Sequence, residues 1–289
     1  MRLSSLAAVL FITQSTAWAD TPTPVWQFDG FKMPESVVYD AHSDKYYVSN
    51  INGGPLENDQ NGSIGFIDPQ TKNARIEWVT GFDSPKGLAL RDRILYVADV
   101  NELVLVNVDK GEVVARYPAP NSQLLNGIAI SDTGDVYVSD WLGNRIYTLT
   151  EQGLTTWFES VDLASPNGLA IKGDWLYVAA WGASPKADFS TESSGNLMRI
   201  SLDTAKLDRF SINQTWVNLD GLHPLSNNQW LTTDFMQGKL LTLNPQGEIL
   251  KELSLAPTAA DFAYRADNSL LIVPYLMSGK VAAYHLDTD

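Results

Sequence analysis

The stretch that decides the fold is Ser165–Trp181, SPNGLAIKGDWLYVAAW, which reads as a turn, a short apolar strand, a second turn and another strand. An Asn-Gly pair stands at the mouth of the first strand. The same arrangement recurs at Leu124–Trp141, LLNGIAISDTGDVYVSDW, and at Asn218–Phe235, NLDGLHPLSNNQWLTTDF, where an Asp replaces the Asn. A polar residue that recurs at one structural position predicts a shared site rather than three unrelated turns.

The pattern extends to three further stretches, which begin at Met33, Ser84 and Ala259. The six matching positions are 51, 40, 41, 53 and 41 residues apart, and they are Glu35, Lys86, Asn126, Asn167, Asp220 and Asp261. A period of roughly 40 to 50 residues with several short strands per unit is typical of a β-propeller. Six copies predict an all-β, six-bladed propeller.

Each copy is followed by two more strand-like runs, such as NRIYTLT at 144–150 and TTWFES at 155–160, which predicts four strands per blade. The sixth copy has no fourth strand before the chain ends, whereas VWQF at 25–28 precedes the first copy. We therefore expect the N-terminal strand to join the last blade and close the ring, which removes free sheet edges. Residues 20–289 then form a single propeller domain.

Residues 1–19 have the pattern of a secretory signal peptide, with Arg2, an apolar stretch of about ten residues and the cleavage pattern Ala17-Trp18-Ala19. No later stretch approaches the ~18 apolar residues of a membrane-spanning helix, so no membrane insertion is expected after cleavage. The chain has no Cys. We expect a protein exported to the periplasm or secreted, stabilised by core burial without disulfides.

The charge argues against nucleic acid as a partner. Removing residues 1–19 takes away one Arg and no acidic residue, so the net charge changes from −14 to −15. Phosphate binding requires clustered Lys and Arg, whereas an acidic chain is compatible with cation binding.

The six matching positions form a ring in this fold. The first strand of each blade lines the central channel of a propeller, so the residue before it lies at one rim. Residues at the end of the second strands surround that ring, and the long connections 51–62 and 182–195 emerge on the same face as candidate lids. We expect substrate contacts there from Asp261, Trp141, Trp181, His223 and Tyr275.

The ring is rich in carboxylate and amide oxygens and contains no His or Cys. Two carboxylates about 4 Å apart repel by roughly 4 kcal/mol at an effective dielectric of 20, so the arrangement requires a compensating cation. Oxygen ligands are those that Ca²⁺ prefers, whereas zinc favours His and Cys. The alternative is that Asn, Asp and Gly are ordinary turn residues, which tolerate left-handed conformations and bond their own backbone.

With these motifs the sequence resembles the calcium-dependent six-bladed propellers that include senescence marker protein (regucalcin) and the gluconolactonases. The resemblance covers the chain from about Val25 to its end and rests on PESVVYD, LNGIAI, PNGLAI and LDGL. It implies a divalent cation, Ca²⁺ first, held by Glu35, Asn126, Asn167 and Asp220.

The resemblance implies a metal-dependent hydrolase that acts on a small lactone or ester, with Asp220 activating water or attacking directly. Lys86 adds positive charge for a leaving oxygen or a substrate carboxylate, or it forms a salt bridge with Asp261. His223, inside its strand, is expected to point into the channel below Asp220. The competing hypothesis is a non-catalytic periplasmic propeller that binds a ligand or a protein partner. A lyase or redox enzyme has no nucleotide or haem pattern here to support it.

Overall fold

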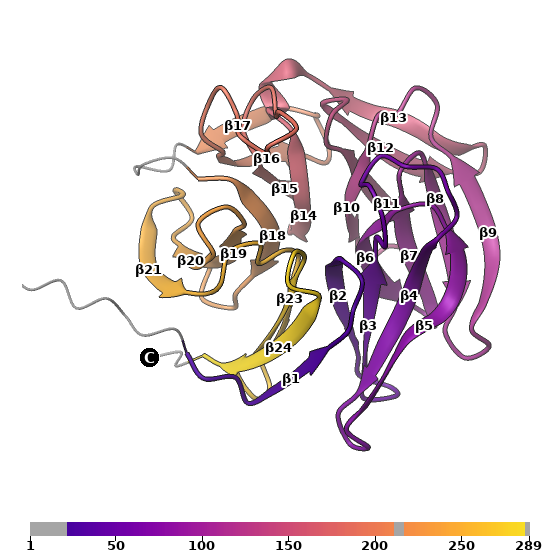
Figure 1. Ribbon diagram of the computed structural model, residues 1–289. Coiled ribbons are helices and arrows are strands. Elements are labelled where there is room, and N and C mark those ends of the chain that lie inside the picture. The colour runs from indigo at the N-terminus through magenta and orange to yellow at the C-terminus, as the bar shows by residue number, and fades with distance from the viewer. Residues whose placement is uncertain (1–21, 211–216, 287–289) are drawn as a thin grey trace, which may run out of the picture.

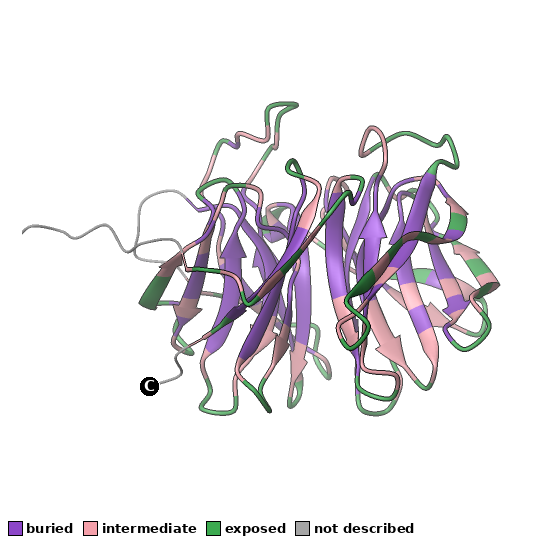
Figure 2. Cartoon of the chain, turned by 60° about the horizontal axis from the view of Figure 1, so that its bottom comes forward, coloured by how far each residue is buried: buried purple, intermediate pink, exposed green. Residues whose placement is uncertain are grey.

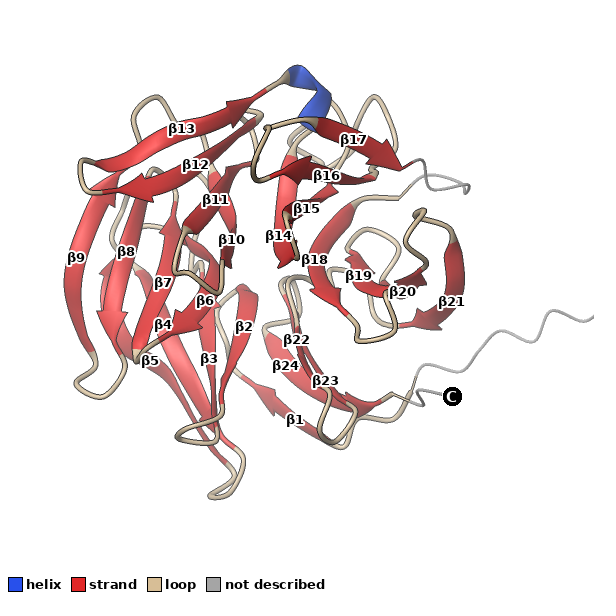
Figure 3. Ribbon diagram, turned by 180° about the vertical axis from the view of Figure 1, so that it is seen from behind, coloured by secondary structure: helices blue, strands red, loops and turns tan. Residues whose placement is uncertain are grey.

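Six four-stranded antiparallel sheets surround a central channel (Figure 1). The computed structural model describes residues 22–210 and 217–286. The predicted all-β propeller with six blades of four strands is confirmed. Among the described residues the one helical element is the 3₁₀ turn η1 (Val161–Leu163), seen at the outer edge of the ring in Figure 3. The predicted signal peptide, 1–19, lies outside the described residues.

Blades one to three run outward from the channel in chain order. Blade one contains β2 (Pro34–Asp40), β3 (Lys45–Asn50), β4 (Gly62–Asp68) and β5 (Asn73–Phe82). Blade two contains β6 (Pro85–Arg91), β7 (Ile94–Asp99), β8 (Glu102–Asn107) and β9 (Glu112–Pro118). Blade three contains β10 (Leu125–Ile130), β11 (Val136–Asp140), β12 (Arg145–Thr150) and β13 (Gly153–Glu159).

Blades four and five repeat this order, and blade six is built from both ends of the chain. Blade four contains β14 (Pro166–Lys172), β15 (Trp175–Ala180), β16 (Leu197–Ser201) and β17 (Leu207–Phe210). Blade five contains β18 (Leu219–Pro224), β19 (Trp230–Asp234), β20 (Lys239–Leu243) and β21 (Ile249–Ser254). Blade six contains β22 (Ala263–Arg265), β23 (Leu270–Tyr275), β24 (Lys280–His285) and β1 (Trp26–Asp29).

The strand β1 pairs antiparallel with β24, with Trp26 opposite Ala283 and Asp29 opposite Lys280. It begins one residue later than the VWQF run, although Val25 N still donates to Ala283 O at 2.7 Å. The outer strand of the last blade is therefore supplied by the beginning of the described chain, beside β24 in Figure 1.

The core lies between neighbouring blades. The second strand β11 is buried at every residue, whereas the outer strand β9 alternates between exposed and partly buried residues (Figure 2). This difference follows from the packing, because inner sheet faces are covered on both sides and the outer strand faces solvent on one. Between blades four and five, the rings of Tyr177 and Trp230 lie 4.1 Å apart.

A β-bulge interrupts the start of five inner strands. Leu125 pairs with Asp140, and the next pair is Ile128 with Val138, so two residues oppose one at this point. The inner strands β2, β6, β14 and β18 show the same shift at the matching position. A bulge re-aims the side chain that it displaces, which turns the residue of each repeat toward the channel.

The Gly of the repeated pair allows inner strands to approach each other. A Cβ on Gly127 would lie 2.3 Å from the carbonyl oxygen of Asn167, and one on Gly87 would lie 2.2 Å from that of Asn126. Gly168 meets the Asp220 carbonyl in the same way, at 2.2 Å. The Asn-Gly pair therefore has two functions: the polar residue faces the channel, and the Gly leaves room for the next blade.

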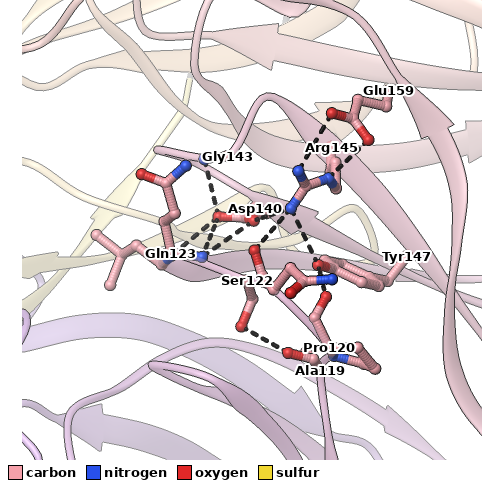
Figure 4. Close-up of polar contacts among 11 residues, drawn as sticks. Ala119, Pro120, Ser122, Gln123, Asp140, Gly143, Arg145, Tyr147 and Glu159 are labelled. Carbon is pink, nitrogen blue, oxygen red and sulfur yellow. Dashed lines mark hydrogen bonds and ion pairs between the residues drawn. The ribbon is translucent and has the colours of Figure 1, made fainter.

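The carboxylate of Asp140, at the end of the second strand β11, holds the turns on either side of it (Figure 4). Asp140 accepts hydrogen bonds from the backbone N–H groups of Leu124 at 2.9 Å and Gly143 at 3.0 Å. Arg145 lies 3.8 Å from Asp140 and is bonded to Glu159 at 2.8 Å. These contacts fix the turn that leads into β10.

No helix among the described residues is long and apolar enough to cross a membrane.

Replacing Gly127 by Ala is expected to lower the free energy of unfolding by about 1–3 kcal/mol, because the added Cβ collides with backbone that cannot move independently. Chemical denaturation measures the change. The control is Gly53→Ala, whose Cβ would meet only side-chain ends, with Glu57 Oε2 at 3.1 Å and Asn61 Oδ1 and Asp59 Oδ2 at 3.4 Å. Equal stabilities of the two variants would contradict the close-packing explanation.

Candidate functional site

A cavity of about 450 Å³ opens at the end of the channel where the inner strands begin. Five of the six ring residues predicted from the repeats line it, and they are Glu35, Lys86, Asn126, Asn167 and Asp220. Each is buried and stands at the bulge of its own inner strand. The repeat therefore brings five polar side chains together at one cavity.

The walls above this polar floor are mostly apolar. They come from second-strand ends and from both long loops, and they include Ile51, Leu56, Leu124, Trp141, Trp181, Phe189, Phe235 and Leu276. The connections 51–62 and 182–195 do reach the cavity as expected, through Leu56 and Phe189. A single cation, Lys186, lies among the wall residues that the structure describes.

The aromatic side chains of the wall pack against one another. The rings of Trp141 and Trp181 meet edge to face at 5.5 Å, and the Trp181 ring lies 5.1 Å from that of Phe235. Trp181 Nε1 donates to the carbonyl oxygen of Phe189 at 3.2 Å. Trp141 and Trp181, both predicted to contact a substrate, therefore stand at the cavity as a rigid wall.

The two carboxylates of the floor are held in an unfavourable environment. Burial, then the nearby charge of Asp261, raises the pKa of Glu35 to about 8, although Lys86 and a hydrogen bond with Asn126 oppose the shift. Burial, then the charges of Glu35 and Asp261, raises the pKa of Asp220 well above its usual value. Ionising both carboxylates of the floor is therefore unfavourable, and a bound cation would offset the repulsion between them.

Glu35 Oε2 and Asp220 Oδ1 are buried and have no hydrogen-bond partner. Leaving such a group unpaired costs about 1–3 kcal/mol or more, so a cation bound against these oxygens would be stabilising. The described residues contain no group of three or more His, Cys, Asp and Glu side chains arranged to hold a metal. The ring offers two carboxylates and two amides instead, a set of oxygens that fits a hard cation such as Ca²⁺.

Lys86 is directed to the backbone of its own turn. Its Nζ donates to the Ser84 carbonyl oxygen at 2.7 Å and to the Ser84 hydroxyl at 3.1 Å. Burial lowers the pKa of Lys86 to about 8, while the charges of Glu35 and Asp99 oppose the shift. Within 22–210 and 217–286 no ion pair joins Lys86 to Asp261, so the salt bridge considered from the sequence is not formed.

Asp261, the sixth ring residue, is not among the residues that line the cavity, and its substrate contact stays a prediction. Its carboxylate accepts the Ser36 hydroxyl at 2.7 Å, and its N–H donates to the Glu35 carbonyl oxygen at 3.0 Å. The named strand β22 begins only at Ala263, but Ala259 bridges Tyr275 and Ala263 pairs with Ile272, so the register shifts by one residue around Asp261 as in the other blades. Asp261 acts on the floor through its charge.

Tyr275 and His223 are also not among the cavity residues. Tyr275 is fully buried between blades, and its hydroxyl lies 2.8 Å from that of Tyr284. His223 packs edge to face against Tyr264 at 5.5 Å, because β18 carries it past the floor. The structure gives both side chains packing contacts, and their predicted substrate contacts stay predictions.

The wall residues Met33, Leu142 and Leu276 were not found from the sequence. Leu142 and Leu276 each directly follow a predicted rim aromatic, Trp141 or Tyr275. In blade six Leu276, the residue after the aromatic Tyr275, lines the cavity instead of Tyr275. Leu142 and Leu276 could have been predicted from the sequence as apolar residues just beyond the end of a second strand.

No protein-family model and no curated protein matches the sequence. The fold is similar to a streptogramin B lyase structure, with a TM-score of 0.62 and 17% identity over 91% of this chain and 87% of the other. It is similar to virginiamycin B lyase from Staphylococcus aureus, with a TM-score of 0.60 and 13% identity over 91% and 89%. It is also similar to Kuenenia stuttgartiensis hydrazine synthase, with a TM-score of 0.63 and 12% identity over 96% of this chain and 100% of the other.

These structural neighbours are enzymes on a similar fold, so a propeller of this shape is compatible with catalysis. At such low identities the similarity shows the fold alone. The resemblance to regucalcin and the gluconolactonases remains a prediction from the sequence motifs.

Burial lowers the pKa of His223 from 6.5 to about 4. As the pH falls, His223 is therefore protonated in the unfolded chain before it is protonated in the folded protein. The free energy of unfolding decreases as the pH falls below about 6.5 for this reason. Relative to a His223→Gln variant, the wild-type free energy of unfolding is expected to fall by about 1–2 kcal/mol between pH 7 and pH 5. Denaturant titrations at the two pH values test this, and parallel changes in both proteins would contradict it.

Proposed function

We propose that the protein is a metal-dependent hydrolase of a small lactone or ester, with a divalent cation, Ca²⁺ first, held by Glu35, Asn126, Asn167 and Asp220. The observation that carries the proposal is the pair of unpaired carboxylate oxygens, on Glu35 and Asp220, at the floor of a cavity. Buried carboxylates without partners are costly unless something positive binds them.

A bound cation would supply Lewis acidity toward a carbonyl oxygen of the substrate. The chain's own residues perform the remaining tasks. Asp220 accepts a proton from the attacking water, and hydrogen bonding with Asn167 holds its carboxylate in place. Burial and the charges of Glu35 and Asp261 raise the pKa of Asp220, and a bound cation would oppose that shift and favour the ionised carboxylate that a general base requires.

Lys86 supplies a fixed positive charge at the floor. Two hydrogen bonds to Ser84 hold its Nζ, so little reorganisation is needed when negative charge develops on a leaving oxygen. The apolar walls keep bulk water away from these groups, which strengthens their electrostatic effect.

The location follows from the predicted signal peptide, which indicates the periplasm or secretion. Calcium sites of exported proteins operate at dissociation constants of roughly 10⁻⁴–10⁻³ M, a range that a site with two carboxylates and two amides can reach. The acidic chain gives no basis for a nucleic-acid partner.

The second candidate is a propeller that binds a small ligand or a protein without chemistry. The position of Lys86 favours this second candidate, because a buried ammonium near Glu35 compensates the negative charge of that carboxylate without a metal ion. The absence of a cluster of three metal-binding side chains among the described residues points the same way.

Calcium titration calorimetry on the chelator-stripped mature protein separates the two candidates. We expect one-to-one binding that Asp220→Asn weakens by about tenfold or more, because a charged ligand is removed. Asp261→Asn is the matched control, since its carboxylate lies outside the cavity, and it should weaken binding less than about threefold. Absence of calcium binding to the wild type would favour the binding propeller.

Hydrolysis of a panel of lactones and aryl esters tests the catalytic role. Asp220→Asn is expected to lower kcat/KM by about 10²–10⁴, the usual contribution of a general base. His223→Gln should keep wild-type turnover, because this side chain lies away from the cavity. Full turnover in Asp220→Asn would reject the mechanism.

A further inference from the structure

We propose that Lys186 makes the cavity selective for molecules that carry a carboxylate at one end, with an apolar body between it and the reacting carbonyl. Such molecules are half-esters of dicarboxylic acids, or lactones with a free carboxylate away from the lactone ring. The inference names the substrate class of the proposed hydrolase and rests on that function for turnover, although not for binding.

Lys186 lies in a loop whose backbone is fixed against the cavity. Its N–H donates to the carbonyl oxygen of Ser190 at 2.8 Å, and its own carbonyl oxygen accepts the N–H of Phe189 at 2.9 Å. The carbonyl oxygen of Phe189 accepts the indole N–H of Trp181, a wall residue, at 3.2 Å. The loop is therefore tied to the wall, and Lys186 is one of the residues that line the cavity.

The ammonium group of Lys186 is left without a hydrogen bond or ion pair by the residues that the structure describes. The nearby Asp188 accepts the hydroxyl of Ser190 at 2.6 Å and its N–H at 3.1 Å. These bonds, and to a smaller extent the charge of Lys186, lower the pKa of Asp188. Lys186 is exposed, and the flexible four-carbon stem of a lysine lets its ammonium reach over the mouth of the cavity.

The floor disfavours an anion at the buried end of the cavity. Glu35 and Asp220 each leave a carboxylate oxygen unpaired there, and these acceptors offer an anion no hydrogen to bond. The ammonium of the floor, on Lys86, already donates twice to Ser84. A ligand carboxylate is therefore directed to Lys186 at the open end, and the neutral carbonyl of the same molecule to the floor.

The walls between the two ends require an apolar body. Leu124, Trp141, Trp181, Phe235 and Leu276 belong to one apolar cluster and offer almost only carbon to a ligand. A polar group placed against them would lose water without gaining a partner. The cavity volume of about 450 Å³ is in the range of sites for small organic ligands.

Matched ligands test the proposal in calorimetric titrations of the mature protein without calcium. The pair is 4-(4-acetylphenyl)butanoate and its primary amide, which share a ketone and an apolar body and differ in the charged end. We expect the carboxylate to bind about fivefold more tightly than the amide, the upper range for an exposed ion pair. The difference should shrink as the salt concentration rises, because exposed charges are screened. Equal affinities at low salt would overturn the assignment of ligand class.

The variant Lys186→Gln removes the charge and keeps most of the stem. The ratio of the amide to the carboxylate dissociation constant should fall to about one, and Lys186→Glu should bring it below one. Lys110→Gln is the matched control, because it removes an exposed lysine that does not line the cavity, and its ratio should stay at the wild-type value. An unchanged ratio in Lys186→Gln would overturn the role of Lys186.

The affinity for the amide separates a charge effect from a structural one. It should be the same in the wild type and in Lys186→Gln, because the amide makes no ion pair. An equal loss of affinity for the amide and the carboxylate would show that Lys186 only supports the loop, and would overturn its role in selection.

Adding calcium tests the orientation of the ligand. A divalent cation at the floor would attract a carboxylate to the end where Glu35 and Asp220 lie. With calcium present, the preference for the carboxylate should still be lost in Lys186→Gln. A preference that persists in this variant would place the carboxylate at the floor and overturn the orientation.

Failure of this inference is distinguishable from failure of the proposed function. The first titrations contain no calcium and use a ketone, so neither metal nor hydrolysis contributes to them. A carboxylate preference that depends on Lys186, without any hydrolase activity, would support the ligand class and reject the hydrolase. Hydrolysis of neutral esters with no preference for the carboxylate would do the reverse.

Discussion

The close approach of neighbouring inner strands at their bulges is the constraint on which the rest of the structure depends. At Gly87, Gly127 and Gly168 the next blade's carbonyl oxygen lies where a Cβ would be, so the strands meet backbone to backbone. This contact brings five side chains from five blades into one small floor. The same local feature therefore shapes the ring and assembles the site.

The floor is stabilised by the fold that surrounds it rather than by its own contacts. Glu35 and Asp220 are buried with unpaired oxygens, and burial raises the pKa of both. Extensive packing between blades offsets this cost, as in the Tyr177 and Trp230 contact. A rigid scaffold that holds an unfavourable polar group is the usual arrangement of a binding or catalytic site.

Floor and wall make different demands on a ligand. The floor offers oxygens and one ammonium, whereas the wall offers mostly aromatic and aliphatic surface together with Lys186. The long loops at 51–62 and 182–195 extend the wall and leave the floor to the inner strands. A ligand with a reactive polar end and an apolar body satisfies both surfaces.

The sequence by itself determined the propeller, its six blades and five of the floor residues, because a polar residue before each first strand repeats at a regular period. It did not determine which rim residues face the cavity. Asp261 and Tyr275 occupy the matching positions in blade six but do not line the cavity, since the Asp261 carboxylate is bonded to the Ser36 hydroxyl and Tyr275 is enclosed between blades. Side-chain direction there depends on packing between blades distant in sequence, which only the tertiary structure decides.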